Sequence, residues 1–256
     1  MLEFTKKVLK KVYLEEFARD LFQNIYKTWK YISWQKQRKF GRVDRRINTD
    51  YFKNHESRKL HIGCGNNIIE GWLNANFSPR SKDIIHLDAT QPFPFANSEF
   101  DYVFSEHMIE HIRFSDGCKM LGECFRILKE NGKIRISTPN LAFLVALYQD
   151  EKTTLQKDYC LWANSKEATD NVVETTPYYL DTFVINNFVR DWGHEFIYDE
   201  KTLQLSLETV GFVNVSLCKL NESESATFRN LENENRMPAG FMELESIIME
   251  GTKWGK

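Results

Sequence analysis

The chain has 256 residues, of which 42% are hydrophobic and 27% charged, so it can bury a sizeable core and is neither disordered nor fibrous. It has no run of roughly 18–20 apolar residues and no signal-peptide pattern at its N-terminus, so we expect neither a membrane span nor secretion. Five widely spaced cysteines without a Cys-x-x-Cys pair exclude a disulfide framework and a zinc ribbon. We therefore predict a cytoplasmic globular unit with appendages.

The formal net charge of −2 conceals an asymmetry along the chain. Residues 1–59 hold 16 Lys and Arg against 7 Asp and Glu, a net charge of +9, which leaves −11 for residues 60–256. Apolar residues recur at helical spacing over residues 1–40 and predict a basic amphipathic helix. Residues 41–57 lose this period and are interpreted as a polar link. The arm could be a solvated or self-docking helix, or it could contact a partner or the inner face of a membrane.

From residue 58 onward, short apolar runs alternate with helical stretches, which predicts an α/β domain over residues 58–256 with a mostly parallel sheet and helices on both faces. We expect strands near residues 59–63, 72–76, 84–88, 100–105, 132–137, 212–218 and 242–251. We expect helices over 115–129, after Pro139, and over 199–210. Ser115 is the predicted N-cap of the first helix, Asn131-Gly132 its stop, and Gly211 ends the last. Residues 151–195 break the rhythm and predict a lid-like insertion on the acceptor side, and residues 221–236 form a charged linker.

A strand runs directly into a glycine turn at residues 60–67, LHIGCGNN. Glycines there let the backbone approach a ligand closely, and open α/β sheets bind ligands beyond the carboxyl ends of their strands. The next predicted strand begins at Trp72, which leaves no room for the crossover helix of a dinucleotide fingerprint. A phosphate-binding P-loop is excluded because no Gly-Lys-Ser/Thr follows.

Three ordered stretches carry a family resemblance, LHIGCGNNIIEGWLNANF, HLDATQPFPFANSEFDYVFSEHMIEH and ECFRILKENGKIRISTPN. With them the chain resembles the class I S-adenosylmethionine-dependent methyltransferases of the methyltransferase-11-like type, over roughly residues 55–256. More narrowly, it is similar to the bacterial branch associated with capsule and surface-polysaccharide synthesis. The resemblance implies a Rossmann-like, seven-stranded sheet, S-adenosylmethionine as cofactor, and methyl transfer to a carbohydrate hydroxyl or a phosphate-type substituent.

The resemblance also implies which residues contact the cofactor. Asp88 matches a carboxylate that accepts from the adenine amino group, and Ala89 a backbone contact to the ring. Asn76 stands where such enzymes usually place an acidic residue for the ribose hydroxyls, so we expect a modest cofactor affinity. The full implied set is Gly63, Cys64, Gly65, Asn76, Phe77, Asp88, Ala89, Ser105, Glu106 and His111.

Methyl transfer to a hydroxyl requires alignment of the reacting atoms and removal of a proton, for which histidine titrates in the right range. His107 and His194 are equal candidates for the base, and His111 is the more positional residue. The segment His107-x-x-Glu110-His111 also matches a zinc-peptidase signature, but its place after a parallel strand favours the methyltransferase interpretation, and we expect no metal site.

The insertion is rich in aromatic residues, which suits stacking on sugar rings, and its cation suits a phosphate. The predicted acceptor-binding residues are Tyr178, Tyr179, Arg190 and Trp192, with Tyr159 and Trp162 in the same composition. These aromatics could equally be the core of a helical lid. Two other functions remain open, a docking adaptor that merely binds nucleoside and an RNA methyltransferase, although the acidic core disfavours nucleic acid as a partner. A homodimer is also considered.

Overall fold

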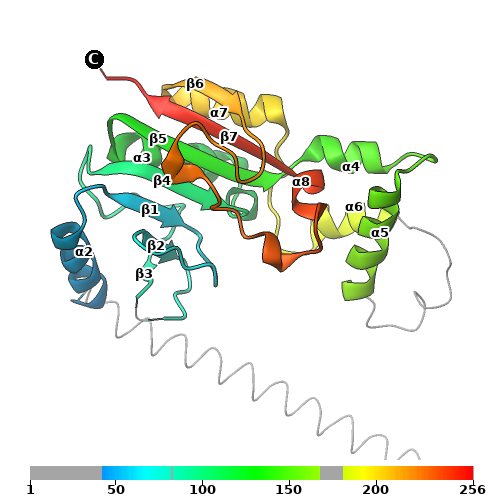
Figure 1. Cartoon of the computed structure of the whole chain (residues 1–256), viewed down its shortest axis with the longest axis horizontal. Helices are drawn as coiled ribbons and strands as arrows, with labels where there is room; N and C mark the ends of the chain where they lie inside the picture. The colour runs from blue at the N-terminus through cyan, green and yellow to red at the C-terminus, as the bar shows by residue number, and fades with distance from the viewer. Residues whose placement is uncertain (1–41, 82, 168–180, 256) are drawn as a thin grey trace, which may run out of the picture. The chain divides into compact units, whose positions relative to one another are not determined.

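The computed structural model describes residues 42–81, 83–167 and 181–255 (Figure 1). Within it, Tyr51–Lys256 forms one compact unit. The predicted arm at residues 1–40 and the predicted acceptor residues Tyr178 and Tyr179 lie outside the described residues. In the described part of the chain, no helix has both the length and the apolar character needed to cross a membrane.

One seven-stranded sheet organises the unit, in the order β3-β2-β1-β4-β5-β7-β6 (Figure 1). Its strands are β1 (Lys59–Ile62), β2 (Leu73–Asn76), β3 (Ile85–His86), β4 (Phe100–Glu106), β5 (Leu128–Pro139), β6 (Phe212–Leu217) and β7 (Ser246–Lys253). The first five strands are parallel, and β7 runs antiparallel to both of its neighbours. The predicted mostly parallel seven-stranded sheet is therefore confirmed.

The central strands are apolar because both of their faces are covered. Leu60 of β1 is in register with Val103 of β4, and Val103 with Ile134 of β5, and all three are fully buried. Strands buried on both faces favour such continuous apolar runs, and these runs are the pattern that predicted the strands from the sequence. The strand order reverses at β1, whose neighbours are β2 and β4, and this is where open α/β sheets form their ligand crevice.

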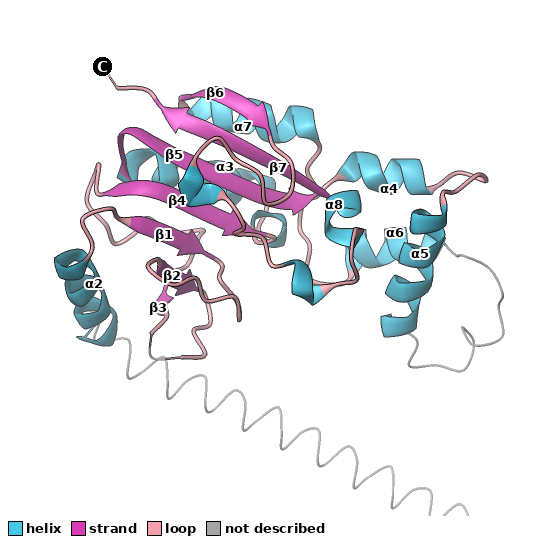
Figure 2. Ribbon diagram, in the orientation of Figure 1, coloured by secondary structure: helices cyan, strands magenta, loops and turns pink. Residues whose placement is uncertain are grey.

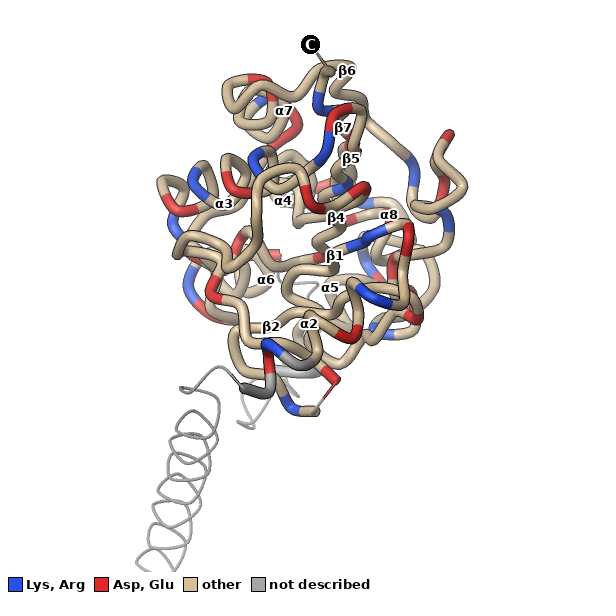
Figure 3. Tube along the Cα trace, turned by 90° about the vertical axis from the view of Figure 1, so that its left-hand side faces the viewer, with Lys and Arg blue, Asp and Glu red and all other residues tan. Residues whose placement is uncertain are grey.

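Helices α3 (Phe114–Ile127) and α7 (Glu200–Val210) pack beside each other against the β5-β7-β6 part of the sheet (Figure 2). Acidic and basic residues alternate along α3, which shows no single-sign stripe (Figure 3). The opposite face of β4 and β5 is covered by the segment 219–236, which contains the short turns η2 (Ala226–Phe228) and η3 (Glu234–Arg236). Phe228 of this segment packs with Phe104 of β4 and with Trp72.

The predicted polar link is wrong in part, because residues 42–54 form a helix, α2 (Arg42–Asn54). Its last turn is fixed by Tyr51, whose hydroxyl accepts from the Lys59 amide at 2.8 Å and lies 3.0 Å from the Lys59 carbonyl oxygen. Phe52 adds edge contacts to Phe95 and Phe100. These contacts join the helix end to residues distant in sequence, so the local pattern did not reveal them.

Two other predicted boundaries are also corrected. Helix α3 begins at Phe114 and ends at Ile127, and residues 128–131 already belong to β5, where Leu128 is in register with Phe100. Residues 241–245 form a helix, α8 (Phe241–Glu245), rather than the start of the last strand. By contrast, α7 is confirmed, since the Asp199 side chain caps its N-terminus and Gly211 ends it at φ 112°.

The described parts of the insertion, residues 151–167 and 181–195, contain helices although their sequence showed no clear period, and they contribute to a separate core cluster. Helices α5 (Thr154–Glu167) and α6 (Asp181–Arg190) pack with α8 and with α4 (Leu141–Leu147). Tyr159 is fully buried there and donates from its hydroxyl to Glu245, while Trp162 packs at the edge of the cluster. Tyr159 is thus a core residue, as the alternative interpretation of the aromatics had it.

A buried histidine in the sheet makes stability depend on pH. His61 of β1 is buried beside Asn74, 3.1 Å from its side-chain oxygen, and burial lowers the pKa of His61 to about 4. An unfolded histidine titrates near about pH 6.5, so between these values the unfolded chain binds a proton that the folded chain does not. The free energy of unfolding therefore decreases as the pH falls through this window.

We expect this residue to account for a loss of about 2 kcal/mol between roughly pH 7.5 and pH 5. In His61→Leu, the acid-induced loss should shrink by that amount, as measured by urea unfolding at the two pH values. His55→Leu is the control, because His55 is only half-buried and stacks on Tyr51. An identical loss in His61→Leu and in the unsubstituted chain would contradict the prediction.

Candidate active site

A cavity of about 640 Å³ lies at the carboxyl ends of the parallel strands. Gly63 follows β1, Asn76 ends β2, Asp88 follows β3 and His107 follows β4, so four strands each deliver one wall residue. The complete lining is Ile62, Gly63, Asn76, Phe77, Leu87, Asp88, Ala89, Thr90, His107, Met108, His111 and Ile112. We refer to it as the cofactor cavity.

The structure brings six of the ten predicted cofactor residues together in this lining, namely Gly63, Asn76, Phe77, Asp88, Ala89 and His111. Cys64, Gly65, Ser105 and Glu106 are not among the lining residues. Glu106 is buried and accepts hydrogen bonds from the Asn233 amide and, at 3.4 Å, from Asn67. Its carboxylate therefore anchors the 219–236 segment to the end of β4.

The cavity wall fits a nucleoside of the predicted kind. Gly63 has φ 74°, and a Cβ at this position would lie 2.3 Å from the Met108 Cγ, so only glycine leaves the wall where it is. One Asp88 oxygen accepts from the amide and the hydroxyl of Thr90, an Asx-type turn that fixes the carboxylate. Phe77 presents an aromatic ring that is 52% exposed.

A second cavity of about 340 Å³ adjoins the first, and we call it the acceptor cavity. Its lining comes from the residue after β4, from η1 (Ile109–His111), the end of β5, helices α5 and α6, the 190–196 loop, η3 with the residue after it, and α8. The lining residues are His107, Glu110, His111, Pro139, Tyr159, Trp162, Phe188, Trp192, His194, Arg236, Met237 and Glu245. Because His107 and His111 line both cavities, the two spaces meet at these histidines.

His107 is held rigidly at this junction. It has a left-handed backbone, φ 44°, an uncommon conformation for a residue other than glycine and one often found at functional sites. Its Nε2 lies 2.8 Å from the Ser246 hydroxyl, and its Nδ1 is 3.6 Å from Glu110 and 3.9 Å from Glu245. Burial, followed by the charge of Arg236, holds the pKa of His107 well below its usual value. The imidazole is therefore neutral at physiological pH.

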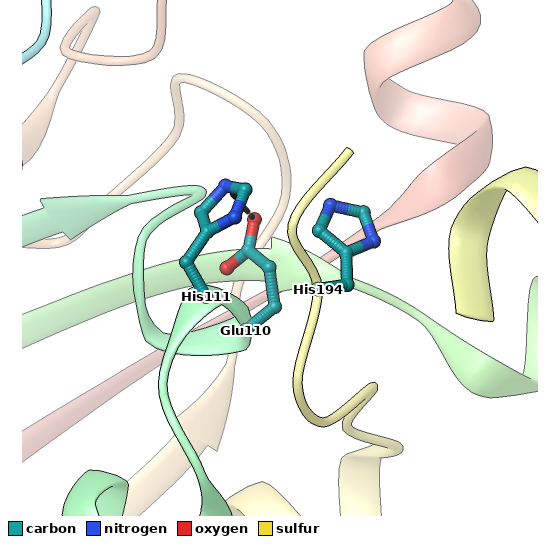
Figure 4. A group of neighbouring side chains, drawn as sticks. All are labelled: Glu110, His111 and His194. Atoms are coloured by element: carbon teal, nitrogen blue, oxygen red, sulfur yellow. Dashed lines mark ion pairs between the residues drawn. The ribbon is translucent and has the colours of Figure 1, made fainter. Parts of the chain in front are cut away.

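Glu110, His111 and His194 form a cluster on the wall of the acceptor cavity (Figure 4). The chain brings them together through backbone bonds, because the amides of Glu195 and Phe196 donate to the Glu110 carbonyl at 2.7 and 3.2 Å. Figure 4 shows the Glu110 carboxylate reaching toward the His111 ring, with the His194 ring across from both. The two ring centroids are 4.9 Å apart.

Each imidazole of the cluster is oriented by a backbone carbonyl. The Nδ1 of His111 lies 3.1 Å from the Gly193 oxygen, and the Nδ1 of His194 lies 2.8 Å from the Phe188 oxygen. A carbonyl can only accept, so each Nδ1 carries a proton, and in the neutral imidazole the lone pair then lies on Nε2. Burial lowers the pKa of His194, which favours this neutral form.

Glu110 is fully buried, and its two oxygens differ. Oε2 accepts from the Thr138 hydroxyl at 3.0 Å, whereas Oε1 has no hydrogen-bond partner among the described residues. Burial raises the pKa of Glu110 to about 8. A carboxyl group in this position is costly unless a donor or a cation compensates it.

Sequence reasoning missed several acceptor-cavity residues. Arg236 supplies the cation there, whereas the predicted Arg190 is exposed at the end of α6 and lines neither cavity. The predicted Trp192 does line the acceptor cavity, with 37% of its surface exposed. Glu245 was assigned to a strand. Among these missed residues, Glu110 is the one with a signal in the sequence, its place in the His-x-x-Glu-His pattern.

Comparisons with known proteins agree with this architecture. The family described as "Methyltransferase domain" matches residues 67–136, which run from the glycine turn to β5. No curated protein sequence matches the chain. Three of the solved structures that are similar to it are described as methyltransferases.

The first is an S-adenosylmethionine-dependent methyltransferase from Archaeoglobus fulgidus, with 18% identity, coverage of 87% of this chain and 99% of that one, and a TM-score of 0.45. The second, from Thermotoga maritima, has 15% identity, coverage of 88% and 97%, and a TM-score of 0.43. The third is a phosphoethanolamine N-methyltransferase of Haemonchus contortus in complex with phosphomonomethylethanolamine and S-adenosylhomocysteine. It has 13% identity, coverage of 78% of this chain and 49% of that one, and a TM-score of 0.42.

The sheet order and the domain match define a Rossmann-like methyltransferase fold. The chain is an S-adenosylmethionine-dependent methyltransferase, and S-adenosylmethionine is its cofactor.

Proposed function

We propose that this methyltransferase methylates a hydroxyl or a phosphate-type oxygen of a carbohydrate acceptor in surface-glycan synthesis. The observation that carries the proposal is the junction of the two cavities at His107 and His111, because a methyl group must pass between a cofactor space and an acceptor space. The aromatic side chains of Trp162 and Trp192 in the second cavity suit a sugar ring, and Arg236 suits an anionic substituent.

In this proposal the cofactor lies in the larger cavity, against Gly63, Asn76, Phe77, Asp88 and Ala89. When bound, S-adenosylmethionine supplies both the electrophilic methyl group and the leaving group, so the protein must supply position and proton transfer. The turn after β3 holds Asp88 ready to accept from a donor on the adenine ring.

We assign different roles to the two predicted catalytic histidines. His107 is neutral, buried and engaged with Ser246, so we propose that it positions the junction between the cavities. His194 is more accessible and keeps an Nε2 lone pair in the acceptor cavity. We propose that this Nε2 accepts the proton of the acceptor hydroxyl as the oxygen takes the methyl group.

The test is transfer of a labelled methyl group from S-adenosylmethionine to nucleotide sugars, lipid-linked glycans, amines and RNA assayed in parallel. We expect label only in the carbohydrate acceptors, as a base-stable methyl ether or as a phosphate methyl ester. His194→Gln should reduce turnover by about 10²-fold or more, in the range of general acid–base contributions. Label confined to amines or to RNA would overturn the proposal. Arg190→Gln is the matched control and should keep the unsubstituted rate, because Arg190 lines neither cavity.

A further inference from the structure

The Glu110–His111–His194 cluster has a composition that the methyl-transfer reaction does not itself require. Its three potential ligand atoms, one carboxylate oxygen and two imidazole nitrogens, all lie within 4.8 Å of one another. The Nε2 of His111 is 4.0 Å from the Glu110 Oε1. Two histidines and one carboxylate are a recurrent ligand set for zinc and for other divalent first-row metals.

We propose that Glu110, His111 and His194 form a binding site for one divalent first-row metal ion, such as Zn²⁺ or Mn²⁺. This departs from the sequence-based expectation of no metal site, and it also departs from the zinc-peptidase signature. That signature pairs two histidines on one helix, whereas here residues 109–111 form a single short turn, and the second histidine comes from a loop more than 80 residues later.

The unpartnered oxygen of Glu110 is an independent observation that points to a cation. Glu110 has no exposed surface, yet none of the described residues donates a hydrogen bond to its Oε1. Two imidazole nitrogens face this oxygen, the His107 Nδ1 at 3.6 Å and the His111 Nε2 at 4.0 Å, and both are beyond hydrogen-bond length. A metal ion ligated by this oxygen would supply the compensation that a buried carboxylate needs.

Hydrogen bonds around the cluster hold its three side chains in orientations that suit metal coordination. The Gly193 and Phe188 carbonyls accept from the Nδ1 atoms of His111 and His194, and this leaves both Nε2 lone pairs available for coordination. The Thr138 hydroxyl holds the other oxygen of Glu110. Such outer hydrogen bonds fix the tautomer and the ring orientation of metal-binding histidines.

The cluster is also open on one side. Glu110 is buried, His194 is half-buried and His111 is exposed, and all three line the acceptor cavity. Three protein ligands with an open position are typical of catalytic rather than structural metal sites. Metal–ligand bonds of about 2.0–2.2 Å require the three groups to lie closer to one another than they do in this structure. An ion here faces the acceptor and would acidify its hydroxyl, and in the ion-bound protein the His194 Nε2 is a ligand and no longer the proton acceptor. This catalytic role rests on the proposed function, but ion binding itself does not.

The test is metal binding to the full chain, free of any histidine tag and dialysed against a chelator. Calorimetric titration with Zn²⁺ and with Mn²⁺ should give one site per chain. His111→Gln and His194→Gln should each weaken the affinity for the metal ion at least about tenfold. Tenfold is the lower end of the loss in metal affinity that follows even when only a hydrogen-bond partner of a ligand is changed. His55→Gln is the matched control and should bind as the unsubstituted chain does, because His55 lies outside both cavities.

A spectroscopic readout keeps the test independent of activity. Co²⁺ in the site should give visible d–d absorption bands that are lost in His194→Gln, while circular dichroism shows that the variant remains folded. Absence of a stoichiometric site, or unchanged affinity in both histidine variants, would overturn the inference. Ion binding without methyl transfer to any carbohydrate would leave the metal site standing and refute the proposed function. Methyl transfer that persists in a chelated chain with no metal site would do the reverse.

Discussion

Gly63→Ala should remove most of the stabilisation that S-adenosylhomocysteine gives to this protein. An added Cβ would lie 2.3 Å from the Met108 Cγ and 2.6 Å from its Cβ, and alanine is strained at φ 74°. Met108 also lines the cofactor cavity, so any shift of Met108 that relieves this clash alters the cavity wall. We expect the affinity for the nucleoside to fall roughly 100-fold, about 2.7 kcal/mol.

Thermal unfolding measures this effect directly. Ligand at about 100 times its dissociation constant stabilises the unsubstituted chain by about 2.7 kcal/mol, which corresponds to a rise of roughly 5–11 °C in Tm. In Gly63→Ala the same ligand concentration only matches the dissociation constant, so the rise should shrink to about 1–2 °C. A full-size shift in Gly63→Ala would show that the glycine turn does not form the cofactor wall.

Gly122→Ala is the matched control for this experiment. Gly122 lies within α3, and a Cβ there meets nothing within 4 Å. The substitution should leave the ligand-induced shift unchanged and raise the stability of the free protein by about 0.5–1 kcal/mol, because glycine is unfavourable inside a helix. The pair of variants separates a steric effect at the cofactor cavity from any general effect of replacing glycine.

The sequence predicted those parts of the fold that local periodicity determines. The strand cores at Leu60, Val103 and Ile134 are continuous apolar runs, and α7 carries both of its end signals, Asp199 and Gly211. The mistaken boundaries depend on partners far away in the chain. Residues 242–245 have strand-like alternation, but Glu245 accepts from the buried Tyr159 hydroxyl and its segment folds into α8. Tertiary contacts override local propensity at such positions.

The candidate site likewise has one part that could be predicted from the sequence and one part that could not. Gly63, Asn76 and Asp88 were predictable because each follows or ends a parallel strand, and the strand ends meet at one edge of the sheet. The acceptor cavity is different, since its residues come from segments without a period. His194 is brought to Glu110 by backbone bonds such as those of residues 195 and 196, and Arg236 lies in the cavity because its segment is fastened to the sheet.

Arg135 is the residue that fastens this segment. It is fully buried on β5, and its guanidinium donates to both oxygens of Glu232, at 2.6 and 3.1 Å, and to Glu250. It also donates to the carbonyls of Lys219 and Glu222, at 3.1 and 3.0 Å. Glu232 has an equally buried side chain, so it has no access to solvent that could replace its partner.

Arg135→Leu should therefore destabilise the protein by about 3–5 kcal/mol, because it leaves the Glu232 carboxylate buried without a cation. The expected fall in Tm is roughly 6–20 °C. Arg229→Leu is the control in the same segment, since Arg229 is exposed and, in the described part of the chain, donates to the backbone carbonyls of Ser223 and Glu224. It should change stability by no more than about 0.5 kcal/mol.

Arg135→Leu should also affect the acceptor cavity more than the cofactor cavity, when it is assayed at a temperature where it remains folded. The 219–236 segment contributes Arg236 to the acceptor cavity and nothing to the cofactor cavity. Methyl transfer in Arg135→Leu should consequently fall by a larger factor than the affinity for S-adenosylhomocysteine, which calorimetry measures on the same sample. A loss of stability below about 1 kcal/mol, or equal losses of transfer and of cofactor affinity, would contradict the fastening role of Arg135.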